Sequence, residues 1–199
     1  MAGQHHDRFF KSLLSRPERA RHFLAEVLPP QVAPHLDLTG TELVAGSFVD
    51  AELREHLTDL LLRVPRRKQG EKTNAAVWVY ALIEHKRHPE PMLPLQLLRY
   101  MVRIWQREAN EGTRGLSPIL PIVFYHGAEQ WDVPASFSDL VDRPEALDPF
   151  VPEFAYQLYE PAADNEGAFA GDEVLRAGVL ALKHAAAGTL DAQAERLVA

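Results

Sequence analysis

The sequence predicts a single α/β domain in which helices flank a mixed β-sheet. Three observations support this fold class. Apolar residues recur with helical spacing over residues 7–28, and β-branched and aromatic residues concentrate in two runs at 77–86 and 118–125. Between these two runs, residues 92–107 again show helical spacing. Helices that alternate with strands along the chain are typical of α/β domains.

The first 28 residues predict one or two helices. Apolar side chains recur at positions i, i+1, i+4 and i+5 in two sets, namely Phe9, Phe10, Leu13 and Leu14, then Phe23, Leu24, Val27 and Leu28. Proline is favoured in the first turn of a helix and excluded from its interior. We therefore expect a second helix to begin at Pro17 and to end before Pro29 and Pro30.

The remaining elements are less strongly marked. Further strands are expected at 42–49, at 57–64 and at 154–159, and a last helix at 173–186. Pro121 interrupts the strand expected at 118–125. Because proline has no N–H to donate to a neighbouring strand, it predicts a strand at the edge of the sheet or the start of a strand.

Composition excludes several classes of protein. The chain has 199 residues, of which 46% are hydrophobic, and it contains no cysteine. A disulfide scaffold, a thiolate nucleophile and a cysteine zinc site are therefore excluded. No apolar stretch approaches the ~18 residues of a membrane span, and the polar, histidine-rich N-terminus is unlike a signal peptide. We expect a cytoplasmic protein with no membrane partner.

Charge is distributed unevenly along the chain. The net charge is −7, yet residues 54–107 contain 11 Lys or Arg against 5 Asp or Glu, a local excess of +6. Phosphate contacts are local, so a basic segment in an acidic chain can face a polyanion. The alternative is an arginine-rich surface that is simply solvated.

Two of the predicted strands contain acidic residues that could together bind a metal ion. Asp59 and Glu84 are symmetric about a point between residues 71 and 72, inside the polar loop 65–76, so a hairpin about this loop would place the two carboxylates opposite each other. Two close carboxylates repel, and a divalent ion such as Mg²⁺ removes the conflict. Lys86 shares a strand face with Glu84 and could assist an attacking water. The alternative is a surface pair of Glu84 with Lys86, with Asp59 as a cap or an arginine partner.

The helix predicted at 92–107 adds polar residues on one face. Gln96 and Tyr100 are separated by one helical turn, and Arg103 follows one turn later. An amide and a phenol placed beside the carboxylates would suit a phosphate or a base. In the alternative, Tyr100 packs in the core and Gln96 is merely exposed.

Several short motifs, taken together and in this order, resemble the recombination-promoting nuclease (Rpn) family, also known as YhgA-like transposases. They are residues 7–11 (DRFFK), 47–50 (SFVD), 58–61 (TDLL), 82–86 (LIEHK), 97–100 (LLRY) and 120–127 (LPIVFYHG), with Trp105 and Trp131. The resemblance covers about residues 5–160. Nothing in the sequence resembles the acidic triad of a DDE-type transposase, so the resemblance is to the nucleases.

The resemblance implies a fold, a cofactor and a set of site residues. The family belongs to the PD-(D/E)XK superfamily, so we expect a restriction-endonuclease-like core with a mixed central sheet flanked by helices. Its members are typically Mg²⁺-dependent DNA endonucleases, and Mn²⁺ is expected to substitute. The implied metal ligands are Asp59 and Glu84, and Lys86 is the implied superfamily lysine, where many Rpn-like sequences have glutamine. Gln96 and Tyr100 are similar to the Q-x-x-x-Y signature of the RecB-like branch, and Arg103 would also position substrate.

Further expectations concern the additional ligand, the partners and the limits of the domain. An extra acidic ligand is expected from either Asp7 or Asp50. DNA-backbone contacts are expected from the basic residues Arg66, Arg67, Lys68 and Arg99, with little direct sequence readout. Residues 1–199 are expected to form one domain with a core at about 5–160 and a C-terminal helical extension at 161–199. The chain is either a short family member or a truncated one, and double-strand cutting would favour a homodimer.

The most favoured function is therefore a Mg²⁺-dependent DNA endonuclease linked to recombination or mobile elements. One alternative is a catalytically inactive nucleic-acid-binding or protein-interaction domain that retains the nuclease fold. A second alternative is a phosphoesterase that acts on RNA or on a small nucleotide.

Overall fold

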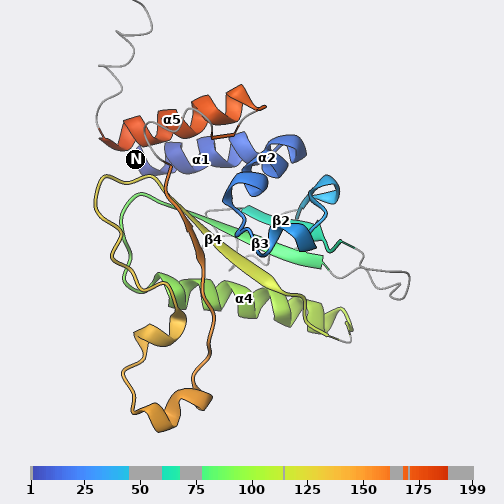
Figure 1. Ribbon diagram of the computed structural model, residues 1–199, viewed down its shortest axis with the longest axis vertical. Helices are drawn as coiled ribbons and strands as arrows, with labels where there is room; N and C mark the ends of the chain where they lie inside the picture. The colour runs from blue at the N-terminus through green and yellow to red at the C-terminus, as the bar shows by residue number, and fades with distance from the viewer. Residues whose placement is uncertain are drawn as a thin grey trace, which may run out of the picture.

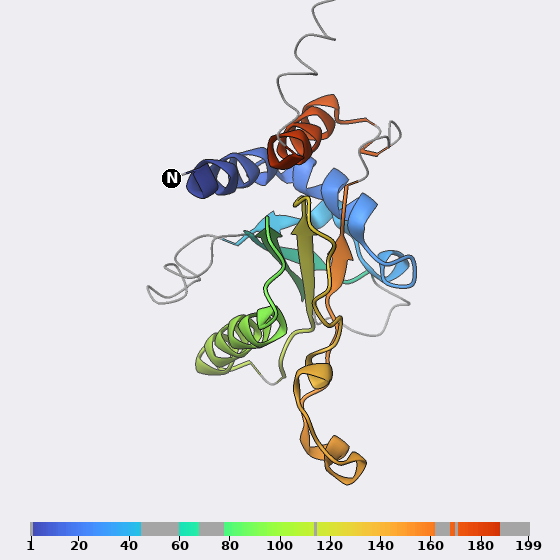
Figure 2. The ribbon, with the colours of Figure 1, turned by 90° about the vertical axis from the view of Figure 1, so that its left-hand side faces the viewer.

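The computed structural model describes residues 2–44, 60–67, 78–113, 115–161, 168–169 and 171–187. These residues form three layers, with a five-stranded sheet in the middle and helices on either side. Helices α1 (Ala2–Leu14), α2 (Pro17–Val27) and α5 (Glu173–Ala187) cover one face of the sheet, and α4 (Leu93–Asn110) covers the other (Figures 1 and 2). The predicted α/β class, with helices on both faces of the sheet, is confirmed.

The strands are β1 (Glu42–Leu43), β2 (Leu60–Pro65), β3 (Trp78–Lys86), β4 (Ile119–Tyr125) and β5 (Gln157–Tyr159). They are ordered β1-β2-β3-β4-β5 across the sheet. The pairs β1–β2 and β2–β3 are antiparallel, whereas the pairs β3–β4 and β4–β5 are parallel, so the sheet is mixed as predicted. Helix α4 makes the crossover that a parallel pair requires between β3 and β4.

The register of β2 against β3 agrees with the hairpin expected from the sequence. Leu60 lies opposite Ile83 at one end of the pair, and Pro65 lies opposite Trp78 at the other. Every pair is therefore centred between residues 71 and 72, inside the predicted loop. This register positions the site because it determines which residues of the two strands are neighbours.

The first of the two alternatives predicted from Pro121, an edge strand, is wrong. β4 lies between β3 and β5, and Pro121 pairs with Leu82 of β3. However, β5 pairs only with residues 122–124 of β4, so Pro121 lies just before that ladder begins. A missing N–H is tolerated there because no β5 residue is paired with this position.

The two faces of the sheet contribute to two separate hydrophobic clusters. Alternate residues of β4 divide between them: Phe124 packs in the cluster with α1, α2 and α5, and Val123 packs in the cluster with α4. Phe124 is fully buried and its ring stacks on Phe10 with centroids 4.7 Å apart. In β2, Leu61 likewise faces α4, while Leu60 faces the opposite cluster. Residues of odd number in both β2 and β4 thus face α4.

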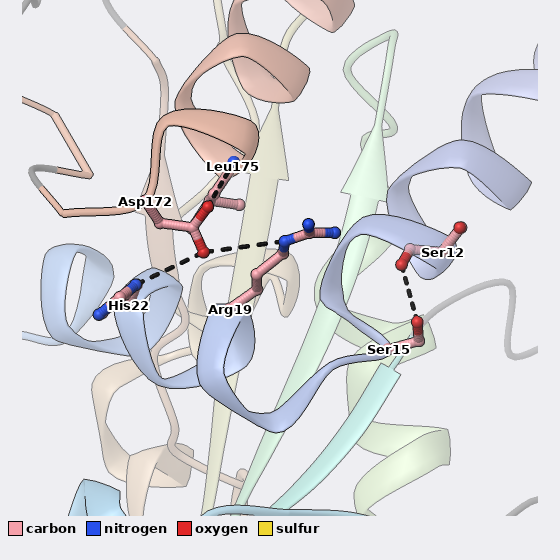
Figure 3. A network of polar contacts seen from close by, with 6 residues as sticks. All are labelled: Ser12, Ser15, Arg19, His22, Asp172 and Leu175. Atoms are coloured by element: carbon pink, nitrogen blue, oxygen red, sulfur yellow. Dashed lines mark hydrogen bonds and ion pairs between the residues drawn. The ribbon is translucent and has the colours of Figure 1, made fainter.

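Helix α5 is attached to α2 through its first turn (Figure 3). Asp172 accepts a hydrogen bond from the backbone N–H of Leu175 at 2.9 Å, as N-cap residues do. Its other carboxylate oxygen lies 3.8 Å from Arg19 Nε and 3.5 Å from His22 Nδ1 of α2. Along α5, Gly178 allows close packing on α1, because a Cβ atom there would lie 2.7 Å from a methyl group of Leu13.

The connection from β4 to β5 contains two short 3₁₀ helices that the sequence did not predict, η3 (Phe137–Leu140) and η4 (Glu145–Phe150). It extends away from the sheet on the α4 side (Figures 1 and 2). Two shorter 3₁₀ helices, η1 (Ala33–His35) and η2 (Leu38–Gly40), follow α2. Within the described residues, no helix combines the length and apolar character that a membrane span needs.

Candidate active site

Lys86 is the last residue of β3 and is only 8% exposed. Lysine is rarely buried unless its ammonium group has partners. Here Nζ donates to Glu90 Oε2 at 3.0 Å and to Gln96 Oε1 at 3.2 Å. Lys86 is therefore buried and not at the surface, whereas its alternative pairing with Glu84 is untested because that side chain is not described. It is a buried cation that joins the end of β3 to the start of α4.

Gln96 extends this contact along α4. Its Nε2 donates to the Tyr100 hydroxyl at 2.6 Å, while its Oε1 accepts from Lys86. The amide is held at both ends, which defines the direction in which it points. Tyr100 is 3% exposed and packs against the apolar cluster under α4, so the core interpretation of its ring is correct. Its hydroxyl nevertheless belongs to the polar chain Lys86–Gln96–Tyr100.

The backbone beyond Lys86 is tightly packed. The N–H of His126 donates to the Lys86 carbonyl oxygen at 3.2 Å, which continues the β3–β4 pairing into the turn. At Gly127 a Cβ atom would lie 2.1 Å from the Arg87 carbonyl oxygen and 2.3 Å from the Tyr125 hydroxyl. Only glycine fits this close approach. The close packing of this turn fixes the position of the strand end that carries Lys86.

The Tyr125 side chain supports the same turn from the other side. Its ring lies 4.8 Å from that of Trp131, and its hydroxyl donates to the Glu129 carbonyl oxygen at 2.7 Å. Burial, together with the nearby Glu129 carboxylate, raises the pKa of Tyr125. The phenol therefore remains a neutral donor at physiological pH, which suits a structural role beside the site.

A cleft of about 290 Å³ opens at the N-terminal half of α4. It is lined by Glu90, Met92, Leu95, Gln96, Arg99 and Tyr100. Two of these residues contact Lys86, and a third, Tyr100, is hydrogen-bonded to Gln96. Arg99 is exposed at the cleft, as expected for a residue that contacts a phosphate. The half-buried Arg103 lies one turn further along α4 and does not line the cleft.

The predicted basic loop is not next to this cleft. Arg66 and Arg67 are exposed at the end of β2 that lies beside Trp78, the first residue of β3. Lys86 is eight residues further along β3, which corresponds to roughly 25 Å of extended strand. Lys68 lies outside the described residues. These arginines could contact DNA only at phosphates far from those near Lys86.

The predicted metal ligands fall largely outside the described part of the chain. Asp59 and Asp50 are not among the described residues, and only the backbone of Asp7, in α1, is described. The backbone of Glu84 lies in β3 opposite Val123, and its side chain is not described. Among the residues that are described, no group of three or more His, Asp or Glu side chains could hold a metal ion. The ligand assignment therefore remains a prediction.

Glu90 is the charged cleft residue that sequence reasoning missed, alongside the apolar Met92 and Leu95. It lies four residues after Lys86 in the turn before α4, and its side chain is 53% exposed. The signal available in the sequence was an acidic residue four positions after a basic one. That signal is meaningful on a helix, where i and i+4 are neighbours. Here a turn brings the two residues together, and only the tertiary structure shows it.

Comparison with known proteins identifies clear relatives. The family described as "Putative transposase, YhgA-like" matches residues 4–199. "Recombination-promoting nuclease RpnA" of Escherichia coli (strain K12) is 34% identical over 124 residues, which are 62% of this chain and 40% of that protein. "Recombination-promoting nuclease RpnD" of Escherichia coli O157:H7 is 34% identical over 124 residues, 62% of this chain and 45% of its own length.

A third relative is named as an inactive protein. "Inactive recombination-promoting nuclease-like protein RpnE" of Escherichia coli (strain K12) is 31% identical over 157 residues, 79% of this chain and 48% of that protein. The chain thus spans less than half the length of each of these three relatives. No solved structure matches the chain.

Proposed function

Because the chain belongs to the YhgA-like family of recombination-promoting nucleases, we propose that it is a metal-dependent endonuclease that hydrolyses phosphodiester bonds in DNA. The observation that carries the proposal is the buried Lys86 at the end of β3, hydrogen-bonded to Gln96, which is in turn bonded to Tyr100. A mixed sheet covered by α1 and α4 is compatible with the restriction-endonuclease-like core that the resemblance implies.

The described neighbours of Asp59 and Glu84 support a metal site on the α4 face. Leu61, two residues after Asp59, and Val123, opposite Glu84, both pack against α4. Lys86, two residues after Glu84, reaches Gln96 of the same helix. Residues two apart on a strand share a face, and continuing the β2–β3 register by one residue would set Asp59 opposite Glu84. We therefore expect both carboxylates beside Lys86.

Such a donor set suits Mg²⁺, which takes oxygen ligands and typically uses one or two carboxylates; Mn²⁺ is expected to substitute. The ion would supply charge stabilisation at the phosphate that is cleaved. Asp7 or Asp50 could add a further carboxylate. The donor set contains oxygen atoms only, which fits a hard cation.

The roles of the polar chain follow from its contacts. The Lys86 ammonium group is held near the expected carboxylates, where it can stabilise developing negative charge or orient the attacking water. Gln96 fixes the position of the ammonium group through Oε1, and Tyr100 fixes the amide in turn. Arg99 lies at the cleft and would neutralise an adjacent backbone phosphate. We propose few base-specific contacts, since no segment of the sequence resembles a recognition helix.

Plasmid nicking tests the proposal. The wild-type chain should convert supercoiled DNA to open-circular or linear forms with Mg²⁺ or Mn²⁺ but not with EDTA. Asp59→Ala and Glu84→Ala should each abolish cleavage, while Asp148→Ala, on the distant η4, should not. Cleavage that survives both site substitutions would show that the ligand assignment is wrong. Parallel reactions with RNA and with small phosphodiesters test the alternative phosphoesterase.

The relative whose name includes "inactive" favours a second candidate, a nucleic-acid-binding domain without turnover. This candidate predicts that the wild-type chain retards DNA in a gel but never cuts it with any divalent ion.

Double-strand cutting would need two sites, so we also propose a homodimer for the active form. The ratio of linear to nicked product at early times, measured against protein concentration, tests that arrangement.

A further inference from the structure

The cleft at the start of α4 combines three kinds of surface that a phosphate alone would not need. Met92 and Leu95 form apolar walls and are 57% and 39% exposed. Glu90 contributes a carboxylate, and Arg99 a guanidinium group. Exposed apolar side chains around a hollow are typical of ligand sites in which a few polar groups determine orientation.

A carboxylate at this place argues against a bare phosphate as the occupant. Glu90 would repel a phosphate, but it can accept a hydrogen bond from the exocyclic amine of a base. One of its oxygens, Oε2, is already used by Lys86. A carboxylate offers about four acceptor positions, so this contact leaves acceptor capacity. Arg99 is suited to the phosphate or to the π-face of the same nucleotide.

The cleft is also directly coupled to the proposed reaction site. Gln96 lines the cleft and accepts a hydrogen bond from Lys86, so a ligand in the cleft lies one side chain from the proposed position of cleavage. Its volume of about 290 Å³ is close to the lower end of the range for small-molecule sites, and it gives more room than a single phosphate group needs. A planar base attached to the strand at the site would fit this combination of size and chemistry.

We infer that this cleft binds one unstacked nucleobase, preferably one with an exocyclic amine, of the DNA strand held at the site. The inference rests on the proposed nuclease function and adds a substrate class to it, namely DNA with an unpaired nucleotide. A base inside an intact duplex cannot reach such a cleft without being flipped out, which costs the energy of unstacking and unpairing it. Single-stranded or distorted DNA avoids most of this cost.

The helix offers a matched pair of variants for the test. Leu95 and Val102 are both 39% exposed and lie seven residues apart, which puts them on the same face of α4. Leu95 lines the cleft and Val102 does not. Leu95→Gln and Val102→Gln make the same polar, uncharged, helix-compatible change at the two positions. Thermal unfolding of both variants should match the wild type, because both side chains are at the surface.

The probe is a short single-stranded DNA with one 2-aminopurine, whose fluorescence reports stacking, titrated with the chain in EDTA so that no cleavage occurs. Covering the exposed part of a leucine side chain with a bound base is worth enough to change affinity by about fivefold or more. We expect Leu95→Gln to weaken binding of this probe by at least about fivefold, and Val102→Gln to leave it unchanged. An abasic nucleotide at the probe position, or a perfect duplex, should remove the difference between the variants.

Two results would overturn the inference: equal affinities of Leu95→Gln and Val102→Gln for the probe, or an equal fluorescence change with single strand and duplex. These results are distinguishable from failure of the proposed function. A chain that binds the probe through Leu95 but never cuts DNA retains the base site and loses the nuclease. A chain that cuts plasmid without distinguishing the two variants retains the nuclease and loses the base site.

Discussion

Replacement of Lys86 by methionine separates a catalytic from a structural role for this side chain. Methionine is similar to the lysine stem in length and flexibility, so it fills the same space without the ammonium group. The substitution removes the contacts to Glu90 at 3.0 Å and to Gln96 at 3.2 Å. The chain keeps the apolar packing at the end of β3.

The expected cost in stability is small. The Glu90 side chain is 53% exposed, so its pair with Lys86 is partly screened by water and is worth about 0–1 kcal/mol. The hydrogen bond from the charged ammonium group to Gln96 contributes about 1.5 kcal/mol, the lower end of the range for bonds to charged groups. Against these losses stands the removed cost of keeping a charge at 8% exposure, together with the gain from burying a thioether. We expect the free energy of unfolding to change by no more than about 1.5 kcal/mol in either direction.

The expected cost in activity is large. A group that assists proton transfer or stabilises charge in the transition state contributes about 100- to 10,000-fold to the rate. Urea unfolding and plasmid nicking on the same preparation measure the two effects. Lys183→Met, at a half-buried lysine of α5 on the opposite face of the sheet, is the matched control and should retain the wild-type rate. If Lys86→Met lost more than about 3 kcal/mol of stability while cutting at the wild-type rate, the lysine would be structural and the reasoning refuted.

Three further predictions concern the scaffold. Gly127→Ala should lower the free energy of unfolding by about 2 kcal/mol or more, because its Cβ would overlap the Arg87 carbonyl oxygen. Gly115→Ala is the control: no atom lies within 4 Å of its Cβ position, so the free energy of unfolding in urea should change by less than about 0.5 kcal/mol. Equal urea midpoints for the two variants would contradict this prediction. Phe124→Ala should cost about 3–5 kcal/mol of unfolding free energy, and Phe150→Ala, at 81% exposure, almost none; similar losses for both would show that the stacked cluster is unimportant. Burial raises the pKa of Tyr159 to about 12 from its ordinary 10.0, so the folded chain retains a proton that the unfolded chain loses, and stability should fall as pH rises from about 10 to about 12. Tyr159→Phe should flatten part of that decline between about pH 10 and about pH 12, and an unchanged slope would rule out this residue as its source.

Local sequence determined most of the elements and their pairing. A helix or strand is present in each region where the spacing of apolar residues predicted one, because burial of one face imposes a period on the chain, although the strand expected at 154–159 covers only Gln157–Tyr159. The strand expected at 42–49 is described only as far as Val44 and pairs over two residues. The β2–β3 register also followed from the sequence, since a slip by one residue would turn Leu61 away from α4.

Tertiary structure decided the environment of the polar side chains. From sequence, a site was the favoured interpretation of Gln96 and an exposed helix face the alternative, and only the approach of α4 to the end of β3 places it against Lys86. The contact with Glu90 depends on a turn, and the interior position of Pro121 depends on where β5 stops pairing. The spacing of apolar residues indicates which face of a helix or strand is buried, because burial selects apolar side chains at every position of that face. It does not record which element covers a given residue, since that is set by crossovers and turns between segments far apart in the chain.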